Sequence, residues 1–583
     1  MNHYWHTPEF LIPPPPPPLQ VRISKCNPYE REQIPNFCHV IQLTDMWVSN
    51  ALEEVFDRWC VCQPVGIFAP TGKGKTTFVR SIVRHCSGHG KVLYLAHRAM
   101  ISSQQKKALC RGLKSEWSTV NDLHAFELMD HFEDIGLSVM SYQKFAARHY
   151  EMDLSQFSWV IFDECHFFYS DALFNLYSDD LLNRLPQLFR HAHRIYMTAT
   201  PGAVLPEISR VEGGSMRICG ITYRSCYRES CGQMLCYFFP EDFSFVKLSF
   251  FKERQEIVDL VVEHPNDKFL IFTSNREDGA TPSEKSYRKL LESAGVTVTY
   301  LDRYTKQTEA WVSLCENERF QTQTLVCTSV LDCGVNIRDD ALRHIVIEST
   351  DKTEFLQMLG RKRRKSGEQI QVYVRVPTVS TLHFRLHNVN EWLGIIDDAE
   401  NATTNEEYSR IFKRGWYDES PGNPYPHLLA PRQNGRTKVK ETAHHALLRQ
   451  QAILEKILNN QAVHGDSAFP IIVLGWLRKE ENCSDITWLG TTQQETVRAK
   501  LISILSEAEG KELSGNTWEN IFSQIKQLIG DLLQKPHDTD RSLQHRAINN
   551  RLHDLNIPFS IEQPRASTYI IKCIDEIGGV CLD

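Results

Sequence analysis

A nine-residue segment near the start of the chain has the residue types and the order that bind a triphosphate. It runs Ala69-Pro70-Thr71-Gly72-Lys73-Gly74-Lys75-Thr76-Thr77, after the apolar run 65–68 and before an expected helix. Glycines let backbone N–H groups approach phosphate oxygens, Lys75 reaches the β and γ oxygens, and the Thr76 hydroxyl completes a magnesium site. Ala69 stands where the generic pattern has its first glycine. Because strand, loop and helix follow in the required order, the sequence favours a phosphate cradle over an ordinary Gly-rich turn.

A pair of carboxylates follows a second apolar run. Residues 159–162 end in Asp163-Glu164-Cys165-His166, and functional carboxylates of a parallel sheet lie at the carboxyl ends of its strands. We expect Asp163 to hold magnesium through water and Glu164 to polarise the water that attacks the γ-phosphate. His166 is then expected to relay between the nucleotide and a domain interface. An acidic strand end in solvent is the alternative, which a neighbouring phosphate loop disfavours.

A basic run lies much further along the chain. Gln357 and Gly360 precede Arg361-Lys362-Arg363-Arg364-Lys365. Arg361 and Arg364 fall one turn apart on an expected helix, so both guanidinium groups can point across a cleft at the γ-phosphate. A solvated basic face is the ordinary alternative, but Gln357 and Gly360 favour the nucleotide role. We expect Arg364 to be an arginine finger and Arg361 its interface partner.

Two series of short apolar runs, separated by amphipathic stretches, frame these motifs. The first series comprises residues 65–68, 92–95, 139–140, 159–162 and 194–197, and the second comprises 269–272, 296–300, 324–327, 344–347 and 371–374. Strands that alternate with helices imply parallel sheets. The sequence therefore predicts an α/β fold with two parallel sheets.

The pattern of apolar residues changes beyond about residue 395, where they recur at helical spacing. Residues 443–459 and 518–533 show this pattern most clearly. The last segment, 545–573, predicts a helix, a strand, a Pro-containing turn and another strand. The C-terminal region is therefore expected to be mainly helical, with a small winged-helix-like end.

The composition is that of an ordinary globular protein. The chain has 583 residues, more than one hydrophobic core usually supports, which predicts several domains. Apolar residues make up 42% of it, and no apolar stretch is long enough to cross a bilayer. Residues 1–6 do not resemble a secretion signal, so we expect a cytoplasmic protein without membrane contact. With a net charge of −7, any nucleic-acid groove must be a local basic patch.

Seventeen cysteines are scattered through apolar runs, which is typical of reduced core thiols rather than of a disulfide framework. Four of them cluster at Cys219, Cys226, Cys231 and Cys236. Their separations lack the short Cys-x-x-Cys spacing of structural zinc sites. Strand cysteines are the favoured interpretation of this cluster.

Taken together, the motifs resemble those of superfamily two helicases. The phosphate loop, the Asp-Glu-Cys-His box and Thr198-Ala199-Thr200 resemble motifs I, II and III. Residues 269–275 resemble motif IV, residues 328–336 motif V, and Gln357-x-x-Gly360-Arg361-x-x-Arg364 motif VI. The matches occur in the family's order, which is more specific than any single motif. The box reads Asp-Glu-Cys-His rather than Asp-Glu-Ala-Asp, and no adenine-reading glutamine motif is found upstream, so the chain resembles the Asp-Glu-x-His group more closely.

The resemblance implies two RecA-like domains that bind ATP and Mg²⁺ between them. It implies that Gly334 and Asn336 contact the nucleotide and that Thr198-Ala199-Thr200 couples hydrolysis to movement. It also implies contacts with a nucleic-acid backbone, for which the matching residues are His97, Arg98, Tyr142, Gln143, Thr273, Asn275 and Thr328. We expect domain limits of 1–40 for a Pro-rich segment, 41–210 and 211–395 for the two RecA-like domains, and 396–583 for the accessory region.

Three functions fit these motifs to different degrees. The leading expectation is an ATP-dependent helicase or translocase that tracks a single strand of DNA or RNA. A P-loop kinase would leave the second sheet and residues 357–364 without a role. A nucleic-acid-gated ATPase switch, within a defence or mobile-element system, is not separated from a motor by the sequence. The proline run Pro13–Pro18 is expected to be a spacer, and a protein partner binding this segment or the C-terminal region is the alternative.

Overall fold

The computed structural model describes the following parts of the chain: residues 35, 37–44, 47–86, 90–97, 106–113, 129–175, 177–218, 233–273, 283–302, 305, 308–328, 335–365, 367–416, 427–433, 436–479, 486–489, 498, 501–502, 504–532, 545–555, 557–565 and 567–573. The proline run, three of the clustered cysteines (Cys219, Cys226 and Cys231), and Arg98, Asn275 and Gly334 lie outside these parts. The described residues form two compact units, 1–486 and 487–583. None of the described helices has the length and apolar character needed to cross a membrane.

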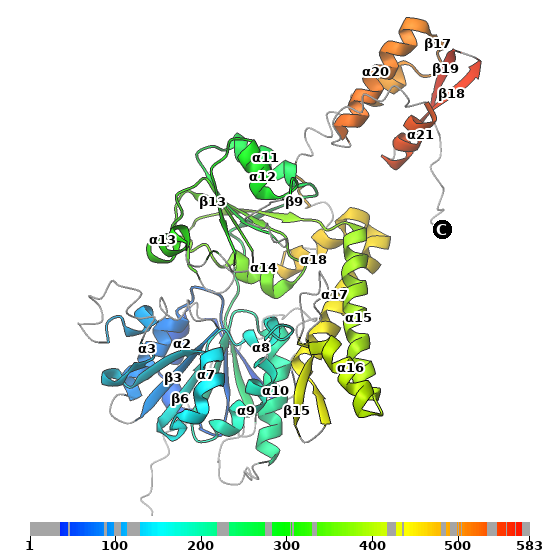
Figure 1. Cartoon of the computed structure of the whole chain (residues 1–583). Helices are drawn as coiled ribbons and strands as arrows, with labels where there is room; N and C mark the ends of the chain where they lie inside the picture. The colour runs from blue at the N-terminus through cyan, green and yellow to red at the C-terminus, as the bar shows by residue number, and fades with distance from the viewer. Residues whose placement is uncertain are drawn as a thin grey trace, which may run out of the picture. The chain divides into compact units, whose positions relative to one another are not determined.

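The first unit begins with an eight-stranded sheet (Figure 1). Its spatial order is β1 (Cys38–Gln42), β8 (Met234–Phe238), β2 (Val65–Phe68), β7 (His193–Thr198), β6 (Phe157–Phe162), β3 (Lys91–Ala96), β5 (Leu137–Ser141) and β4 (His131–Phe132). All pairs are parallel except β4 with β5. The central strands are buried on both faces, which is why they read as continuous apolar runs.

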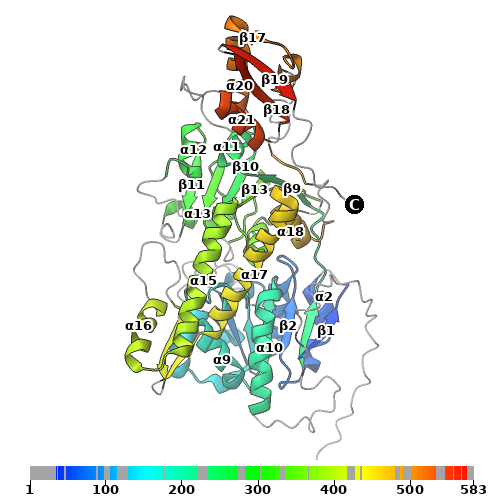
Figure 2. The same ribbon diagram turned by 90° about the vertical axis from the view of Figure 1, so that its right-hand side faces the viewer.

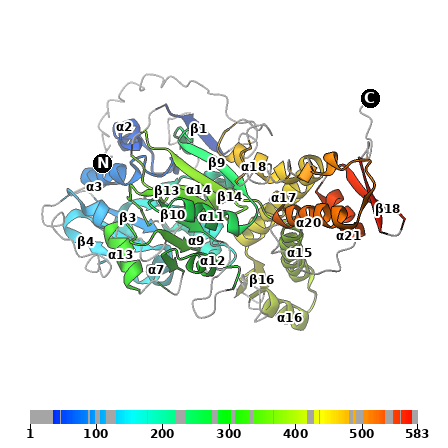
Figure 3. The same ribbon diagram turned by 90° about the horizontal axis from the view of Figure 1, so that it is seen from above.

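Helices flank this sheet, as Figures 1 and 3 show. They are α2 (Val48–Leu52), α3 (Lys75–Cys86), α7 (Tyr142–Arg148), α8 (Phe167–Ser170), α9 (Ser178–Leu188) and α10 (Pro201–Ile218). Three of them directly follow chemistry-bearing segments: α3 follows the phosphate loop, α8 the Asp-Glu-Cys-His box, and α10 the Thr-Ala-Thr segment. The sheet therefore presents these segments at the carboxyl ends of β2, β6 and β7.

A second, six-stranded sheet lies in the same unit. Its order is β11 (Val298–Leu301), β12 (Thr324–Cys327), β10 (Lys268–Phe272), β13 (Leu342–Ile347), β14 (Ile370–Arg375) and β9 (Val246–Phe251), and all its pairs are parallel. Its helices are α11 (Arg254–Glu263), α12 (Tyr287–Ser293), α13 (Glu309–Asn317) and α14 (Lys352–Leu359). The expected α/β fold with two parallel sheets is confirmed, and each apolar run expected to be a strand overlaps one.

The structure moves one expected domain limit. We placed the end of the first RecA-like domain at residue 210, but β8 pairs with both β1 and β2 of the first sheet. The first sheet is therefore completed only at Phe238, because its β8 strand returns after α10. The sequence analysis did not identify β1 or β9 as strands, and it expected Cys236 of β8 on a strand without assigning that strand to the first sheet.

Beyond β14 the first unit continues with a helical region. It consists of α15 (Val379–Asn401), α16 (Asn405–Trp416), the antiparallel hairpin β15 (Leu429–Gln433) and β16 (Arg436–Val439), α17 (Glu441–His464) and α18 (Ala468–Trp476). Figure 2 shows α15 and α17 side by side, and the two helices are in contact. The mainly helical character that we expected here is confirmed.

Helices α17 and α18 of this region contact the domains of different sheets. At the start of α17, Lys440 Nζ donates to the Ala172 carbonyl at 2.9 Å and the Thr442 N–H donates to Asp179 Oδ1 at 3.1 Å. In α18, the Trp476 ring lies 5.5 Å from the Phe355 ring of α14. The region therefore bridges the two sheets.

The second unit contains β17 (Leu513–Ser514), α20 (Gly515–Leu532), α21 (His545–Asp554), β18 (Phe559–Arg565) and β19 (Thr568–Cys573). Its three strands are antiparallel, in the order β17-β19-β18. A core of its own includes Leu505, Trp518, Ile525, Leu552 and Ile571. The helix, strand, turn and strand expected over residues 545–573 are present.

Candidate active site between the two sheets

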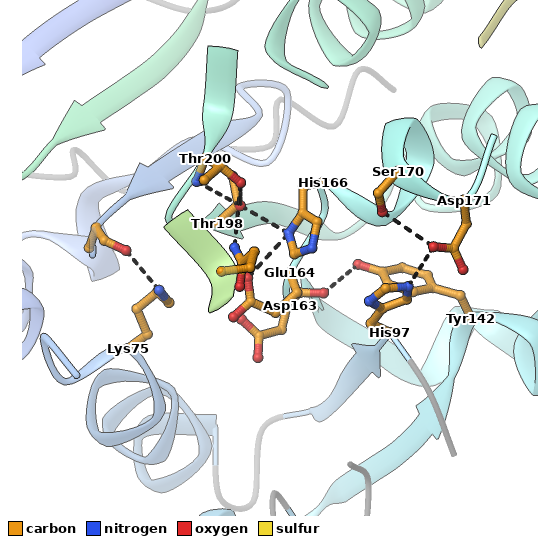
Figure 4. A network of polar contacts seen from close by, with 12 residues as sticks. Lys75, His97, Tyr142, Asp163, Glu164, His166, Ser170, Asp171, Thr198 and Thr200 are labelled. Atoms are coloured by element: carbon orange, nitrogen blue, oxygen red, sulfur yellow. Dashed lines mark hydrogen bonds and ion pairs between the residues drawn. The ribbon is translucent and has the colours of Figure 1, made fainter. Parts of the chain in front are cut away.

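The phosphate loop joins β2 to α3 in a conformation that only glycine adopts easily. Gly72 and Gly74 have φ angles of 85° and 83°, in the left-handed region. The Lys75 ammonium lies within the loop, where Nζ donates to the Ala69 carbonyl at 2.7 Å (Figure 4). The half-exposed indole of Trp47 lies beside Gly74, because a Cβ at Gly74 would be 3.5 Å from its Cε3 atom. Trp47 thus lies against the loop at Gly74, and the Lys75 ammonium is hydrogen-bonded to the loop's own backbone.

Asp163 is buried at the end of β6, held on three sides. Its N–H donates to the Leu95 carbonyl at 2.9 Å, and its own carbonyl accepts the Tyr142 hydroxyl at 2.9 Å. The Tyr94 hydroxyl donates to Asp163 Oδ2. Burial, and then the charge of Glu164, raise the pKa of Asp163 to about 6. The position of this carboxylate is therefore fixed by the sheet and not by solvent.

Glu164 has the unusual backbone φ of 47°, which is uncommon for a residue with a side chain. Its side chain is 20% exposed and faces charged groups. Burial alone would raise its pKa, but the His166 hydrogen bond and the charges of Lys75 and Arg361 together hold it well below the usual range. Glu164 is therefore a carboxylate at neutral pH, able to accept a proton from water.

His166 starts a chain of polar contacts that leaves the first sheet, most of which Figure 4 draws. Its Nδ1 atom lies 3.3 Å from Glu164 Oε2 and 3.2 Å from Thr198 Oγ1. Thr198 and Thr200 are 3.4 Å apart through their hydroxyls. Gln357 Nε2 of α14 donates to Thr200 Oγ1 at 3.5 Å, the limit of a hydrogen bond. Glu164 is thus linked to the second sheet's domain.

The basic run approaches the phosphate loop closely. A Cβ at Gly360 would lie 3.0 Å from Thr71 Oγ1, so a larger residue there would push the two apart. Arg361, which is buried, donates from Nε to the Gln357 carbonyl at 3.0 Å and from Nη2 to Gln357 Oε1 at 2.7 Å. Gln357 thereby orients Arg361 as well as contacting Thr200.

The expectation that Arg361 and Arg364 share a helix is wrong. Helix α14 ends at Leu359, and the following residues run beside Ile337, whose N–H donates to the Arg361 carbonyl at 2.9 Å and whose carbonyl accepts the Arg363 N–H at 2.8 Å. Side chains alternate in such an extended segment, so Arg361 and Arg363 point to one side and Arg364 to the other.

The contacts of the two later arginines agree with that alternation. Arg363 Nη1 is 3.6 Å from the Cβ position of Gly72, and its Nε donates to Asn336 Oδ1 at 2.8 Å. Burial and the charge of Arg361 lower its pKa to about 10, so it stays charged at neutral pH. The exposed Arg364 instead lies over the Phe245 ring, with 3.3 Å from Cζ to the ring centre. The structure brings Arg363, which the sequence analysis did not select, to the phosphate loop.

The residues expected to contact nucleic acid are placed less uniformly. His97, Tyr142 and Thr273 are buried, whereas Gln143 and Thr328 are partly exposed. Thr273 Oγ1 accepts from Arg254 Nη2 at 2.9 Å beside the buried Glu348. Three of the described candidates are therefore internal residues, and their side chains contact other protein groups.

The proposed metal ligands fit magnesium by their chemistry. Thr76 supplies a hydroxyl and Asp163 a carboxylate, and oxygen donors of this kind, completed by water and phosphate oxygens, are those that Mg²⁺ prefers. Among the described residues, no group of three or more His, Cys, Asp or Glu side chains could hold a metal ion by itself. A nucleotide-bound magnesium is therefore the metal that these residues suit.

A phosphate loop and a carboxylate pair on one parallel sheet, faced by arginines from a second, define a two-domain P-loop NTPase. Two family models match the chain: the res subunit of type III restriction enzymes over residues 26–203, and the conserved helicase C-terminal domain over residues 252–366. The chain belongs to the superfamily two helicases, with two RecA-like domains, and these are the domains of ATP-hydrolysing helicases.

Individual relatives are distant. The mouse ATP-dependent RNA helicase DHX58 is 30% identical over 151 residues, which are 23% of this chain and 22% of that protein. The chain thus matches about a fifth of the length of this curated relative. Yeast Dbp5 bound to RNA and ADP BeF3 covers 55% of this chain and 81% of its own, at 13% identity and a TM-score of 0.37. Mycobacterium smegmatis helicase Lhr bound to ssDNA and AMP-PNP covers 85% of this chain and 68% of its own, at 14% identity and a TM-score of 0.38.

Proposed function

We propose that this protein is a nucleic-acid-stimulated ATPase that moves along one strand of DNA or RNA, as a helicase or translocase. The observation that carries the proposal is the polar chain from Glu164 through His166 and Thr198 to Thr200 and Gln357. Such a chain makes the position of the second domain depend on the site of hydrolysis, which a motor requires and a simple kinase does not.

The chemistry assigned to the first domain follows from its charges. Lys75 and the loop N–H groups bind the phosphates, and Thr76 and Asp163 hold the magnesium that neutralises them. Glu164, kept ionised by its neighbours, orients the attacking water and accepts its proton. The residue beside it, Asp163, stays in place because Tyr94 and Tyr142 hold it.

The second domain is proposed to supply positive charge as the γ-phosphate leaves. Arg361 and Arg363 lie on the side that faces Glu164 and Gly72. ATP then favours the closed arrangement because it contacts both domains, and hydrolysis removes that bridge. If the strand-holding surfaces differ between the two arrangements, each cycle produces one step along the strand.

The experiment measures ATP hydrolysis by the full chain alone and with single-stranded DNA, duplex DNA or RNA. We expect single strands to stimulate turnover, and Glu164→Gln to lower stimulated kcat by about 10²-fold or more while ATP still binds. Lys75→Ala should lose both binding and turnover. Wild-type turnover that no nucleic acid changes, or full activity in Glu164→Gln, would contradict the proposal.

Strand displacement on overhang substrates separates the motor from the alternative switch. Displacement that requires ATP and fails in Glu164→Gln supports a helicase. Stimulated hydrolysis without displacement or movement would favour the nucleic-acid-gated switch instead. The same assay identifies the preferred strand, DNA or RNA.

A further inference from the structure

Two residues that we expected to touch nucleic acid are buried against the carboxylate box. His97 follows β3 directly, and Tyr142 opens α7. Both side chains point toward the segment 163–171, as Figure 4 shows. Neither can contact a strand through its side chain, yet each belongs to a segment that the sequence assigns to the strand-binding surface.

His97 forms a buried polar contact with Asp171, the residue that follows α8. His97 Nε2 is 3.0 Å from Asp171 Oδ1, and both side chains are 4% exposed. Ser170 Oγ also donates to this carboxylate, at 3.3 Å. A buried polar group that lost its partner would be left unsatisfied at a cost in free energy, so the contact holds the two residues together. The end of β3 is thereby tied to the far end of the segment that begins at Asp163.

The His97 ring also touches the residue that holds Glu164. Its ring centre is 5.6 Å from that of His166, at 83° between the planes, and 5.0 Å from Phe167. His166 in turn lies 3.3 Å from Glu164. Because interiors are close-packed, a displacement of His97 must move or rotate the His166 ring.

Tyr142 makes a second connection from α7 to the same segment. Its hydroxyl donates to the Asp163 carbonyl at 2.9 Å, and its ring stacks on Phe167 at 4.7 Å and 4°. Ser141 caps the helix, accepting the Lys144 N–H at 3.1 Å, so Tyr142 sits at a rigid helix start. The next residue, Gln143, is partly exposed and available to a ligand.

We propose that the His97–Asp171 pair and Tyr142 are positioning residues that transmit occupancy of the strand-binding surface to Glu164 through His166. This inference rests on the proposed function. A strand that binds the outer faces of these two segments shifts His97 and Tyr142 within the core. The shift sets His166, and with it the Glu164 carboxylate, in the orientation that activates water. The residues thus raise stimulated turnover without contacting ATP or the strand.

The test is Asp171→Asn in the full chain, which keeps the shape and removes the charge. We expect basal kcat, the KM for ATP and the half-maximal strand concentration to stay within about twofold, while stimulated kcat falls about tenfold. His97→Gln should lose a similar factor, and the double variant should lose little more than either single one, because the pair acts as one unit.

The matched control is Glu212→Gln, which breaks a buried ion pair of the same domain. Arg194 Nε of β7 is 2.9 Å from Glu212 Oε1 of α10, with 4% and 0% exposure. It should lower thermal stability as Asp171→Asn does, yet keep the ratio of stimulated to basal kcat. If Asp171→Asn does not fold, Tyr142→Phe removes only a hydroxyl. Because this hydroxyl also holds Asp163, basal and stimulated kcat should both fall, the stimulated kcat by a few fold more than the basal kcat.

Two results would overturn the inference. One is an Asp171→Asn protein stimulated as strongly as the wild type, with Tyr142→Phe also unchanged. The other is an Asp171→Asn protein whose basal and stimulated kcat fall together, as expected of a merely structural pair. A wild type that no strand stimulates overturns the proposed function and this inference with it, whereas a stimulated wild type confines the failure to the inference.

Discussion

Arg363 differs from its arginine neighbours in what it faces. Its guanidinium approaches Gly72 of the phosphate loop, whereas Arg364 stacks on Phe245 and donates to the Glu368 carbonyl at 3.1 Å. A positive charge at the phosphates stabilises the transition state, while one on an aromatic surface does not. The expectation that Arg361 and Arg364 face the same side presumed a shared helix, but α14 already ends at Leu359.

Arg363→Ala should therefore lower stimulated kcat by about 10²-fold or more with a smaller change in ATP affinity. The matched control is Arg364→Ala, which removes the same charge one residue away and should change kcat by less than about threefold. ATPase kinetics and nucleotide titrations of both proteins give the comparison. Equal losses in the two variants, or a larger loss in Arg364→Ala, would return the finger role to Arg364.

At the scale of single residues, the sequence was a better guide to which residues are candidates than to where their side chains lie. Lys75, Asp163, Glu164 and Gln357 could be selected because the roles proposed for them follow from residue type and neighbouring motif. The burial of His97 could not, because its partner Asp171 lies far along the chain and no local pattern pairs them. Likewise, Arg363 turns toward the loop only because residues 361–363 pair with Ile337.

At the scale of elements, the central strands were the easiest to predict. β2, β6 and β10 are buried almost throughout, so their apolar runs are continuous. β1 and β9 lie at the outer edges of their sheets; no residue of β1 is fully buried, and only part of β9 is. Their sequences carry neither a continuous run nor a clean alternation, which is why they were missed.

The start of helix α17 is capped by a residue of α9, a contact that no local sequence motif predicts. The side chain of its N-cap residue, Lys440, makes no capping hydrogen bond. The carboxylate of Asp179 in α9 instead accepts a hydrogen bond from the Thr442 N–H. Asp179 is buried and negatively charged groups stabilise a helix start. A residue of the first sheet's domain therefore supplies the N-terminal cap of α17.

Asp179→Ala should lower the free energy of unfolding by about 1–2 kcal/mol, because it removes this cap. Asp180→Ala is the control: that residue is 56% exposed and only pairs with Arg184 along the helix, so its loss should cost less than about 0.5 kcal/mol. Denaturant midpoints of the three proteins measure the difference. Indistinguishable midpoints for the two variants would show that the cap contributes nothing to stability.

At the scale of the whole molecule, the two units have separate cores. The second unit's core includes Trp518, whose ring stacks on Tyr569 at 4.0 Å and 12°. The chain between β17 and β19 closes a three-stranded sheet on two helices, so the unit covers its own apolar face. A domain of this size is small but within the range that folds alone.

The fragment 487–583 should therefore unfold cooperatively by itself, with coincident transitions in far-UV circular dichroism and in tryptophan fluorescence. Trp518→Ala should unfold it or cost about 3–5 kcal/mol, because it empties a large core position. Glu562→Ala, which removes an exposed pair with Lys572 on the neighbouring strand, should cost less than about 0.5 kcal/mol. A fragment that shows no cooperative transition would mean that its core needs the first unit.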